Sequence, residues 1–397
     1  MANLTPYESC IAVDASSADG LGLPINGNAE AVSAWERDSA NAPALTLYQT
    51  SAWAKIAVRY DLATGRRPIL LSHRDQSGQR FSIPLSIARE RGVLVARLLA
   101  EPLAEYGGAI GPVSSEGLRA ALLDLRKTYG VDLVVLRRVP CESSLGAASA
   151  ALCAPVGGME APLIRLANNG PLLSPGGGRS QGYANASRLR RRMQRDGDYA
   201  FNVYPGNPSV RQAVELALEW KKDWAREQRL ISRMIYDDAH NAVMCDLLSH
   251  PTLEACVGVL QHRGAPVAIE CGFVQGDRFF ADLRAYRPDR RSDGVGHAAM
   301  AEMVEWAARR GLAIYDKGPP ALRYKIEWSR ETMHVADRVL PLSGLGTLRH
   351  QFEDKLKPIA KAAFWHLPLP IRESILALAG YKGRNLLGRS SEPPVTH

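Results

Sequence analysis

The chain is 397 residues long, beyond the ~250 to 300 residues at which one hydrophobic core usually stops growing, so two domains are expected. Its hydrophobic fraction of 46% and charged fraction of 23% argue against a disordered chain, a coiled coil or a polytopic membrane protein. The net charge of +8 is uneven, because residues 179–195 hold six Arg and no acid and residues 345–390 carry a net +5. Such local basicity indicates an anionic partner: a nucleotide cofactor, RNA or an acidic lipid surface.

The N-terminal residues and the spacing of the cysteines predict the cellular compartment and whether a metal is bound. Five acids precede the first basic residue, Arg37, so the positively charged start of a signal peptide is missing and a cytoplasmic protein is predicted. The six cysteines include no C-x-x-C pair, and no His lies at ligand spacing. Buried free thiols are therefore expected, with no metal site.

The first half of the chain predicts a small mixed α/β unit. Residues 1–44 have no helical or strand period and are expected to form a loosely ordered arm. Two β-prone runs, 67–73 and 80–85, predict a hairpin, and 93–100 predicts a third strand. A helix over 118–129 then leads into a buried strand over 131–136.

A Pro and Gly cluster at 171–178 predicts a loop between domains. The second half then predicts the order β-α-α-β-β-β-α-β, with a final strand over 333–340 after it. Its elements are a strand at 199–204, helices at 208–228 and 237–248, strands at 255–261, 267–274 and 278–286, a helix at 295–310 and a strand at 312–316. The first half shows a weak echo of this order, so a degenerate tandem repeat of one α/β fold with a mixed sheet is predicted.

One glycine-containing loop stands out, at the entry to the helix over 295–310. It reads Arg291-Ser292-Asp293-Gly294-Val295-Gly296, an R-x-x-G-x-G pattern. Such a loop directs successive backbone N–H groups and the positive end of the helix dipole to one point, as a pyrophosphate requires. A polar connector that merely has glycine at the helix start is the alternative.

This order of elements with R-x-x-G-x-G between the fourth strand and the third long helix resembles the GNAT acyltransferase superfamily. Further similarity points to the CelD/BcsL-type acetyltransferases, which are related to the Fem peptidyltransferases. It rests on the Arg-rich segment 189–195, on 282–288 and on Tyr324-Lys325-Ile326-Glu327-Trp328. The resemblance covers about residues 45–345 and implies two GNAT-like units in tandem, with acetyl-CoA or another acyl-CoA as donor. One departure is Asp316-Lys317-Gly318-Pro319-Pro320, where an Asp-Phe and glycine turn is more usual.

The chemistry that the resemblance implies is acyl transfer, in which a base takes a proton from an amine or hydroxyl and N–H groups hold the developing oxyanion. Strand alternation over 278–286 places Phe280, Asp282, Arg284 and Tyr286 on one face, which we expect to line a cleft. Asp282 is the first candidate for the base, Tyr286 is a further catalytic candidate, and Arg284 is a candidate for substrate binding. A solvated Asp282 paired with Arg284 is the alternative.

Three further residues are candidates for catalysis or binding. Glu270 interrupts an apolar run and is either exposed at an edge or buried with a raised pKa, which would make it a base. Tyr324 follows the fifth strand of the repeat, where the resemblance implies a general acid, although an interface aromatic is the alternative. Lys325 either binds an anionic group of acceptor or donor or is solvated.

Two basic segments have competing interpretations. One helical face carries four arginines: Arg188, Arg191, Arg192 and Arg195. This face would clamp phosphates, and Arg191 is then a substrate-binding candidate. Alternatively, it lies in solvent against Glu215 or Glu219. The segment has no interleaved aromatics, so a dedicated nucleic-acid site is disfavoured. The tail, with Leu348, Phe352 and Phe364 among lysines, either packs as an ordinary helix or lies on an anionic membrane surface, peripheral to the inner membrane.

The sequence therefore predicts an N-terminal arm (1–44), a degenerate GNAT-like domain (45–178), a GNAT acyltransferase domain (179–345) and a basic helical tail (346–397). The predicted enzyme transfers an acyl group from acyl-CoA to an amine or hydroxyl of a small molecule, a saccharide or a cell-envelope precursor. Two alternatives remain open. One is a Fem-like enzyme that uses aminoacyl-tRNA, and the other is a non-catalytic scaffold of a polysaccharide assembly system.

Overall fold

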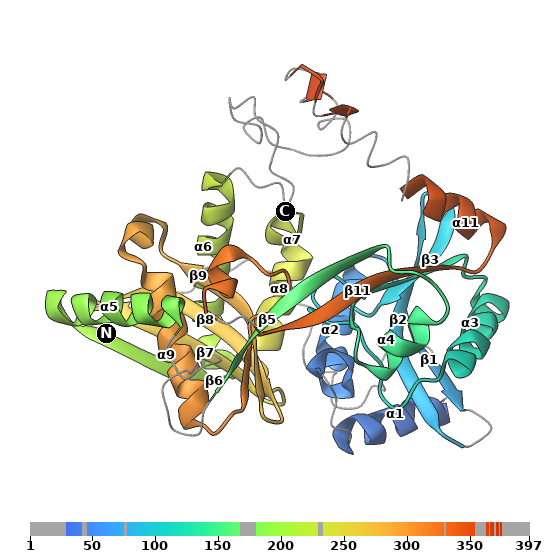
Figure 1. The fold of residues 1–397 in the computed structure, drawn as a ribbon, viewed down its shortest axis with the longest axis horizontal. Helices are drawn as coiled ribbons and strands as arrows, with labels where there is room; N and C mark the ends of the chain where they lie inside the picture. Colours follow the sequence, from blue (N-terminus) through green and yellow to red (C-terminus); the bar gives the residue numbers. More distant parts are fainter. Residues whose placement is uncertain are drawn as a thin grey trace.

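The computed structural model describes residues 29–41, 46–74, 78–166, 180–228, 233–328 and 331–353, with short pieces at 363–364, 366–368, 371–372 and 374. Its strands run in one continuous sheet of eleven, in the order β1-β2-β3-β4-β11-β5-β10-β9-β8-β7-β6. Two lobes flank the long strands β5 and β11, which run from one lobe to the other (Figure 1). The mixed α/β class predicted from the sequence is confirmed.

The first lobe begins with helices α1 (Ala29–Asn41) and α2 (Ser51–Ala63) and then forms three antiparallel strands. These are β1 (Arg67–Arg74), β2 (Arg80–Glu90) and β3 (Val93–Leu98). Helix α3 (Ser115–Tyr129) returns the chain so that β4 (Leu133–Pro140) pairs parallel to β3. Ser114 caps the start of α3, and Gly130, in the left-handed conformation, ends it.

The second lobe repeats this order. Strands β7 (Ala255–His262), β8 (Ala265–Gln275) and β9 (Arg278–Tyr286) are antiparallel, and helix α9 (Val295–Arg309) brings β10 (Ile314–Asp316) parallel to β9. Helix α5 (Gln181–Asp196) and strand β6 (Tyr199–Pro205) precede it, followed by α6 (Arg211–Glu227), α7 (Arg233–Tyr236) and α8 (Asp238–Leu248).

Opposite faces of the second lobe's strands bury against different helices. Ile269, Cys271 and Phe273 of β8 share a core cluster with residues of α6 and α8. The neighbouring residues Ala268 and Val274 instead bury with residues of α9. This alternation is the period-two pattern of a strand that is covered on both sides.

The two lobes exchange strands. After helix α4 (Ser144–Ala150), strand β5 (Gly157–Arg165) leaves the first lobe and pairs antiparallel to β10 of the second. In return β11 (Glu331–Pro341), which follows the short helix α10 (Arg323–Ile326), inserts between β5 and β4. Helix α11 (Gly344–Gln351) then packs on β11. Because of this exchange, both lobes share one sheet.

A shared core also joins the lobes. Tyr48 and Tyr106 of the first lobe place their rings about 6 Å from that of Phe280 in β9, at 6.1 Å and 6.2 Å between centroids. Tyr60 of α2 donates a hydrogen bond to Asp237 at the start of α8, with 3.2 Å between oxygens. Burial of each large aromatic contributes on the order of 1.5–3 kcal/mol, so this junction is a stable part of the fold.

The structure contains elements that the sequence did not predict, including the short helices α4, α7 and α10. Residues 29–41 form helix α1, where a loosely ordered arm was expected. Helix α2 and strand β5 were not predicted, because their sequences show no clean period before their tertiary partners are known. The remainder of the arm up to 28, the loop at 171–178 and most of the basic tail lie outside the described residues.

Candidate active site

Strand β9 carries a β-bulge where the two lobes meet. The register with β8 runs from Gly272 opposite Ala281 to Cys271 opposite Leu283, so Asp282 is the extra residue. Gly272 permits this distortion, because a Cβ at that position would lie 2.1 Å from the carbonyl oxygen of Phe280. The bulge turns the Asp282 side chain out of the regular alternation.

The bulge overturns the predicted faces of β9. Phe280 buries with Leu283 and Ala285 on the side of α6 and α8. Arg284 pairs with Glu270, and Tyr286 packs with the cluster under the first turns of α9. The expectation that Phe280, Asp282, Arg284 and Tyr286 share one face is therefore wrong, because an inserted residue reverses the alternation beyond it.

Strand β9 also parts from its neighbour at the bulge. Strand β10 pairs with β9 only over Arg278 to Phe280, and beyond Phe280 the next residues of β9 pair with β8 alone. One edge of β9 therefore has backbone groups with no strand partner among the described residues. Backbone N–H groups on such an open edge, at the splay between β9 and β10, can hold a developing oxyanion.

A cavity of about 300 Å³ lies at this splay, between the two lobes. The first lobe contributes the loop after β3, including Glu105, and the second contributes α6, α8, the bulged part of β9 and residues 317–325. Four of the predicted site residues line it together: Asp282, Arg284, Tyr324 and Lys325. The fold thus gathers side chains that lie more than 40 positions apart in the sequence.

Asp282 is the acid best suited to accept a proton in this cavity. Burial, followed by the charge of Glu105, raises the pKa of Asp282 to about 8, although a hydrogen bond from Tyr48 and the charge of Arg138 act in the opposite direction. The Tyr48 hydroxyl donates to Asp282 over 3.4 Å. Glu105 is itself held by Arg138 at 2.9 Å. A carboxyl with a pKa near the working pH is an efficient general base.

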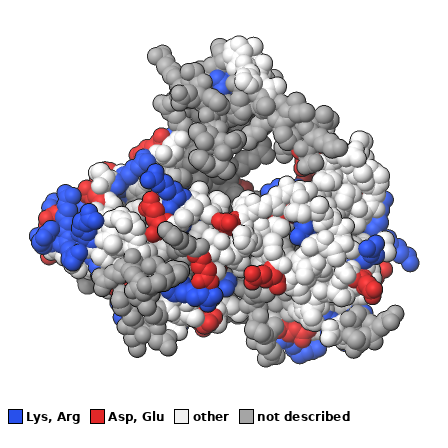
Figure 2. All heavy atoms as spheres, in the orientation of Figure 1, with Lys and Arg blue, Asp and Glu red and all other residues white. Residues whose placement is uncertain are grey.

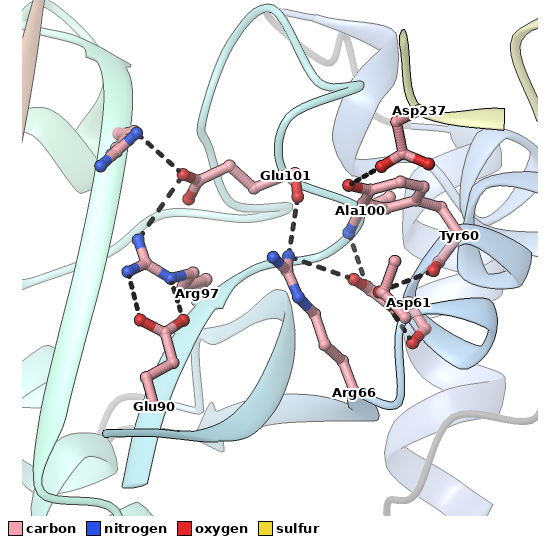
Figure 3. A network of polar contacts seen from close by, with 10 residues as sticks. Tyr60, Asp61, Arg66, Glu90, Arg97, Ala100, Glu101 and Asp237 are labelled. Carbon is pink, nitrogen blue, oxygen red and sulfur yellow. Dashed lines mark hydrogen bonds and ion pairs between the residues drawn. The ribbon is translucent and has the colours of Figure 1, made fainter. Parts of the chain in front are cut away.

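The loop that carries Glu105 is fixed by the polar network in Figure 3. Buried Asp61 accepts a hydrogen bond from the amide of Ala100 at 2.7 Å, and Arg66 donates to the carbonyl of Glu101 at 2.7 Å. Burial raises the pKa of Asp61 to about 6, although the Ala100 hydrogen bond and the Arg66 charge lower it in part. These contacts hold residues 100–101, directly before the part that lines the cavity.

Glu270 does not line the cavity but contacts Arg284, which does. It is fully buried and accepts hydrogen bonds from Arg284, at 2.8 Å, and from Tyr315. The Arg284 guanidinium in turn lies 5.3 Å from the centroid of the Tyr324 ring. Glu270 thereby anchors Arg284, while its assignment as a base stays a prediction.

The surroundings of Tyr324 favour the protonated form of its phenol. It lines the cavity, and burial raises the pKa of its phenol while the Arg284 charge lowers it in part. A phenol that stays protonated near neutral pH can donate to a departing thiolate.

Two lysines make hydrogen bonds that stabilise the segment over 316–325, which includes the departure from the family pattern. Lys317 donates to the carbonyl of Lys325, and Lys325 donates to the carbonyl of Gly318 at 2.7 Å. Both are buried, and burial lowers the pKa of Lys317 to about 6 and that of Lys325 to about 8. Lys317 stands where the resemblance implies a turn residue, and it places a second amine in the cavity wall.

The R-x-x-G-x-G loop lies on the other face of the sheet, at the start of α9. Gly294 has φ of 69°, the left-handed conformation that favours glycine, and no side chain caps the helix. The amides of Val295 and Gly296 have no hydrogen-bond partner among the described residues. Arg291 and Ser292 are exposed, and Asp293 is paired with Arg290. The helix start therefore has free N–H groups of the kind that an anion site requires, and its binding of the donor stays a prediction.

Helix α5 borders this loop. The Leu189 side chain contacts Gly294, where a Cβ would lie 2.4 Å from its Cδ1 atom. The predicted arginine face of α5, Arg191 among them, is exposed, and Figure 2 shows basic side chains gathered at the end of the molecule where Figure 1 draws this helix. The alternative partners Glu215 and Glu219 instead pair with Arg211 and Lys222.

The sequence missed Glu105 and Lys221, which line the cavity, and Tyr48, which donates to Asp282. These residues showed no local signal, because their approach to Asp282 depends on how distant segments pack. Lys317 alone had a signal, as part of the departure from the family pattern. Tyr286 and Arg191 lie outside the cavity lining.

The described residues hold no group of His, Cys, Asp and Glu side chains arranged to bind a metal ion. No helix in the described ranges is both long and apolar enough to cross a membrane.

Comparison with known proteins agrees with this geometry. Residues 180–326 match a family model described as an acetyltransferase (GNAT) domain. No curated protein sequence matches the chain.

Solved structures resemble most of the chain at low sequence identity. FemX is 11% identical with a TM-score of 0.55, and the match covers 81% of this chain and 98% of FemX. A tandem GNAT protein from the clavulanic acid biosynthesis pathway is 11% identical with a TM-score of 0.39, covering 79% and 95%. L-PGS from Bacillus licheniformis is 13% identical with a TM-score of 0.44, covering 77% and 96%. Residues 180–326 therefore form a GNAT acetyltransferase domain, within a mixed α/β fold whose two lobes repeat one order of elements.

Proposed function

We propose that this GNAT-fold acyltransferase moves an acyl group from acyl-coenzyme A to an amine or hydroxyl acceptor in the cavity between the lobes. The observation that carries the proposal is the pairing of an uncapped helix start at Gly294 with a bulged, splayed β9 that presents Asp282. The thioester supplies an activated acyl carbon when the donor is bound.

The donor's diphosphate fits the start of α9. The free amides of Val295 and Gly296 and the positive end of the helix dipole would bind it, and exposed Arg291 adds a positive charge. The exposed arginines of α5 near Leu189 would meet the donor's remaining phosphate. The splay between β9 and β10 would let the donor's thioester reach the cavity from this face.

The residues of the cavity divide the proton transfers between them. The acceptor's nitrogen or oxygen bonds to the acyl carbon as the carbon–sulfur bond breaks. Asp282 takes the acceptor's proton, and Tyr324 delivers one to the sulfur. Backbone N–H groups on the free edge of β9 stabilise the negative oxygen that forms between these steps.

Calorimetric titration of the full chain with acetyl-CoA tests the donor assignment. We expect binding in the wild type and at least tenfold weaker binding in Gly296→Val, which adds a branched side chain at one of the two free amides. Gly294 is less suitable for this test, because a side chain there collides with Leu189. Aminoacyl-tRNA binding without acetyl-CoA binding would favour a Fem-like donor, for which the exposed arginines of α5 are suited. Binding of neither would refute both enzymes.

A further inference from the structure

Lys221, on helix α6, carries a charge that the protein itself does not neutralise. Its side chain lines the cavity, and its ammonium lies 4.5 Å from the centroid of the Trp224 ring. Among the described residues no carboxylate pairs with it, and the charge that acts on it, that of Arg284, is also positive. A partly desolvated ammonium without a counter-charge is unfavourable, so its position calls for a ligand.

The other basic residues of α6 show how unusual this is. Arg211 pairs with Glu215 at 3.0 Å, Lys222 with Glu219 at 3.1 Å and Arg226 with Asp223 at 2.6 Å. Each of these pairs lies at the surface and follows helical spacing. Lys221 is the basic residue of this helix that the described acids leave unpaired.

The remaining charges of the cavity do not compensate Lys221. Arg284 is neutralised by Glu270, and Glu105 is neutralised by Arg138. Lys317 and Lys325 direct their N–H groups to backbone carbonyls and have no carboxylate partner among the described residues. The cavity therefore holds an excess of amines beside one acid, Asp282, that has only a hydroxyl partner.

The donor's phosphates do not meet this need. Lys221 lines the cavity, whereas none of residues 291–296 does. Helix α6 covers the face of β8 and β9 opposite α9, although the loop over 288–293 also contacts α6. An anion beside Lys221 would therefore come from the acceptor.

We infer that the acceptor is an amine that also carries an anionic group, a carboxylate or a phosphate ester, and that Lys221 binds this anion while Asp282 takes the amine's proton. The inference rests on the proposed acyl transfer and narrows its acceptor class. A cavity of about 300 Å³ accommodates a small molecule of this kind or the end of a larger precursor.

Binding of paired probes to the full chain tests the inference independently of turnover. O-phosphoethanolamine carries an amine and a phosphate, and ethanolamine is its counterpart without the phosphate. β-Alanine carries an amine and a carboxylate, and propylamine is its counterpart without the carboxylate. We expect the anionic member of at least one pair to bind tenfold or more tightly than its counterpart by calorimetry. Lys221→Met should abolish that preference, while Lys222→Met, which removes the adjacent surface charge, should preserve it.

Thiol release from acetyl-CoA gives the second readout. With the preferred probe as acceptor, Lys221→Met should lower kcat/KM at least tenfold, mainly through KM, and leave the affinity for acetyl-CoA unchanged. Equal binding of both members in both pairs, or the same loss in Lys222→Met, would overturn the anion site. A preference for anionic probes in a chain that binds no acetyl-CoA would instead refute the acyl-CoA reaction and retain the anion site.

Discussion

The two lobes have the same order of elements but use the same connection differently. In the first lobe, residues 99–114 join β3 to α3, and the Ser114 side chain caps that helix by accepting from the amide of Gly117 at 3.0 Å. In the second lobe, residues 287–294 join β9 to α9, and Gly294 leaves the helix start open. Strand β9 is bulged, whereas the β2–β3 register is regular.

This difference assigns the lobes separate tasks. The Ser114 side chain satisfies an amide that an anion would otherwise bind, so the start of α3 does not have the open character of the proposed donor site at α9. Its longer connection instead bends toward the junction and brings Glu105 to the cavity. The first lobe is therefore part of the candidate active site, although the resemblance described it as degenerate.

The largest expected effect is the loss of Asp282, the residue that distinguishes β9 from β3. Asp282→Asn should lower kcat by on the order of 10²–10⁴-fold with a small change in acetyl-CoA affinity, because only proton transfer is lost. In the wild type, the active form is the ionised carboxylate, so kcat/KM should rise with pH through about 8. This rise should be absent in the variant.

The matched control is Asp277→Asn, which changes an exposed acid in the turn before β9. It should retain full activity. Equal losses of turnover and acetyl-CoA affinity in Asp282→Asn would demote Asp282 to a structural residue.

The next largest effects are expected for two variants, one at the start of α9 and one at the start of α3. Gly296→Val should weaken acetyl-CoA binding about tenfold or more with little loss of stability, since its Cβ requires only a small shift of the Tyr286 ring, 3.0 Å away. Ser114→Ala should do the reverse and lower the free energy of unfolding by about 1 kcal/mol without changing acetyl-CoA affinity. Weaker acetyl-CoA binding in Ser114→Ala would contradict the division of tasks.

The contribution of the first lobe can be measured through Glu105. Glu105→Gln removes a negative charge that raises the pKa of Asp282 and leaves the Arg138 charge, which lowers it. The rise of kcat/KM should therefore move to lower pH, with the plateau changed only a few-fold. Glu116→Gln, at an exposed acid of α3, is the control. An unshifted profile would show that Glu105 does not act on Asp282.

The smallest effect concerns the network that supports the Glu105 loop. Because burial raises the pKa of Asp61 to about 6 in the folded state, the folded chain binds the proton more tightly than the unfolded chain. Stability should therefore fall as pH rises from about 4 to 6, by on the order of 2–3 kcal/mol. Asp61→Asn should flatten this slope in urea unfolding at several pH values, and exposed Asp124→Asn should not. An unchanged slope in Asp61→Asn would assign the dependence to other groups.

The sequence by itself determined the strongly periodic and punctuated parts of this protein. Apolar alternation placed β7, β8 and β9, and the glycine pattern placed the open start of α9, because local spacing and backbone chemistry decide these features. The α/β class and the tandem repeat followed from their order.

Only the tertiary structure decided which residues meet. The bulge at Asp282 depends on the approach of Phe280 to Gly272 across the β8–β9 pairing, and it reversed the predicted faces of β9. The exchange of β5 and β11 and the meeting of Glu105, Lys221 and Asp282 join segments that are distant in the sequence. Such contacts arise from packing between lobes, and no periodicity within one segment encodes its partner on another.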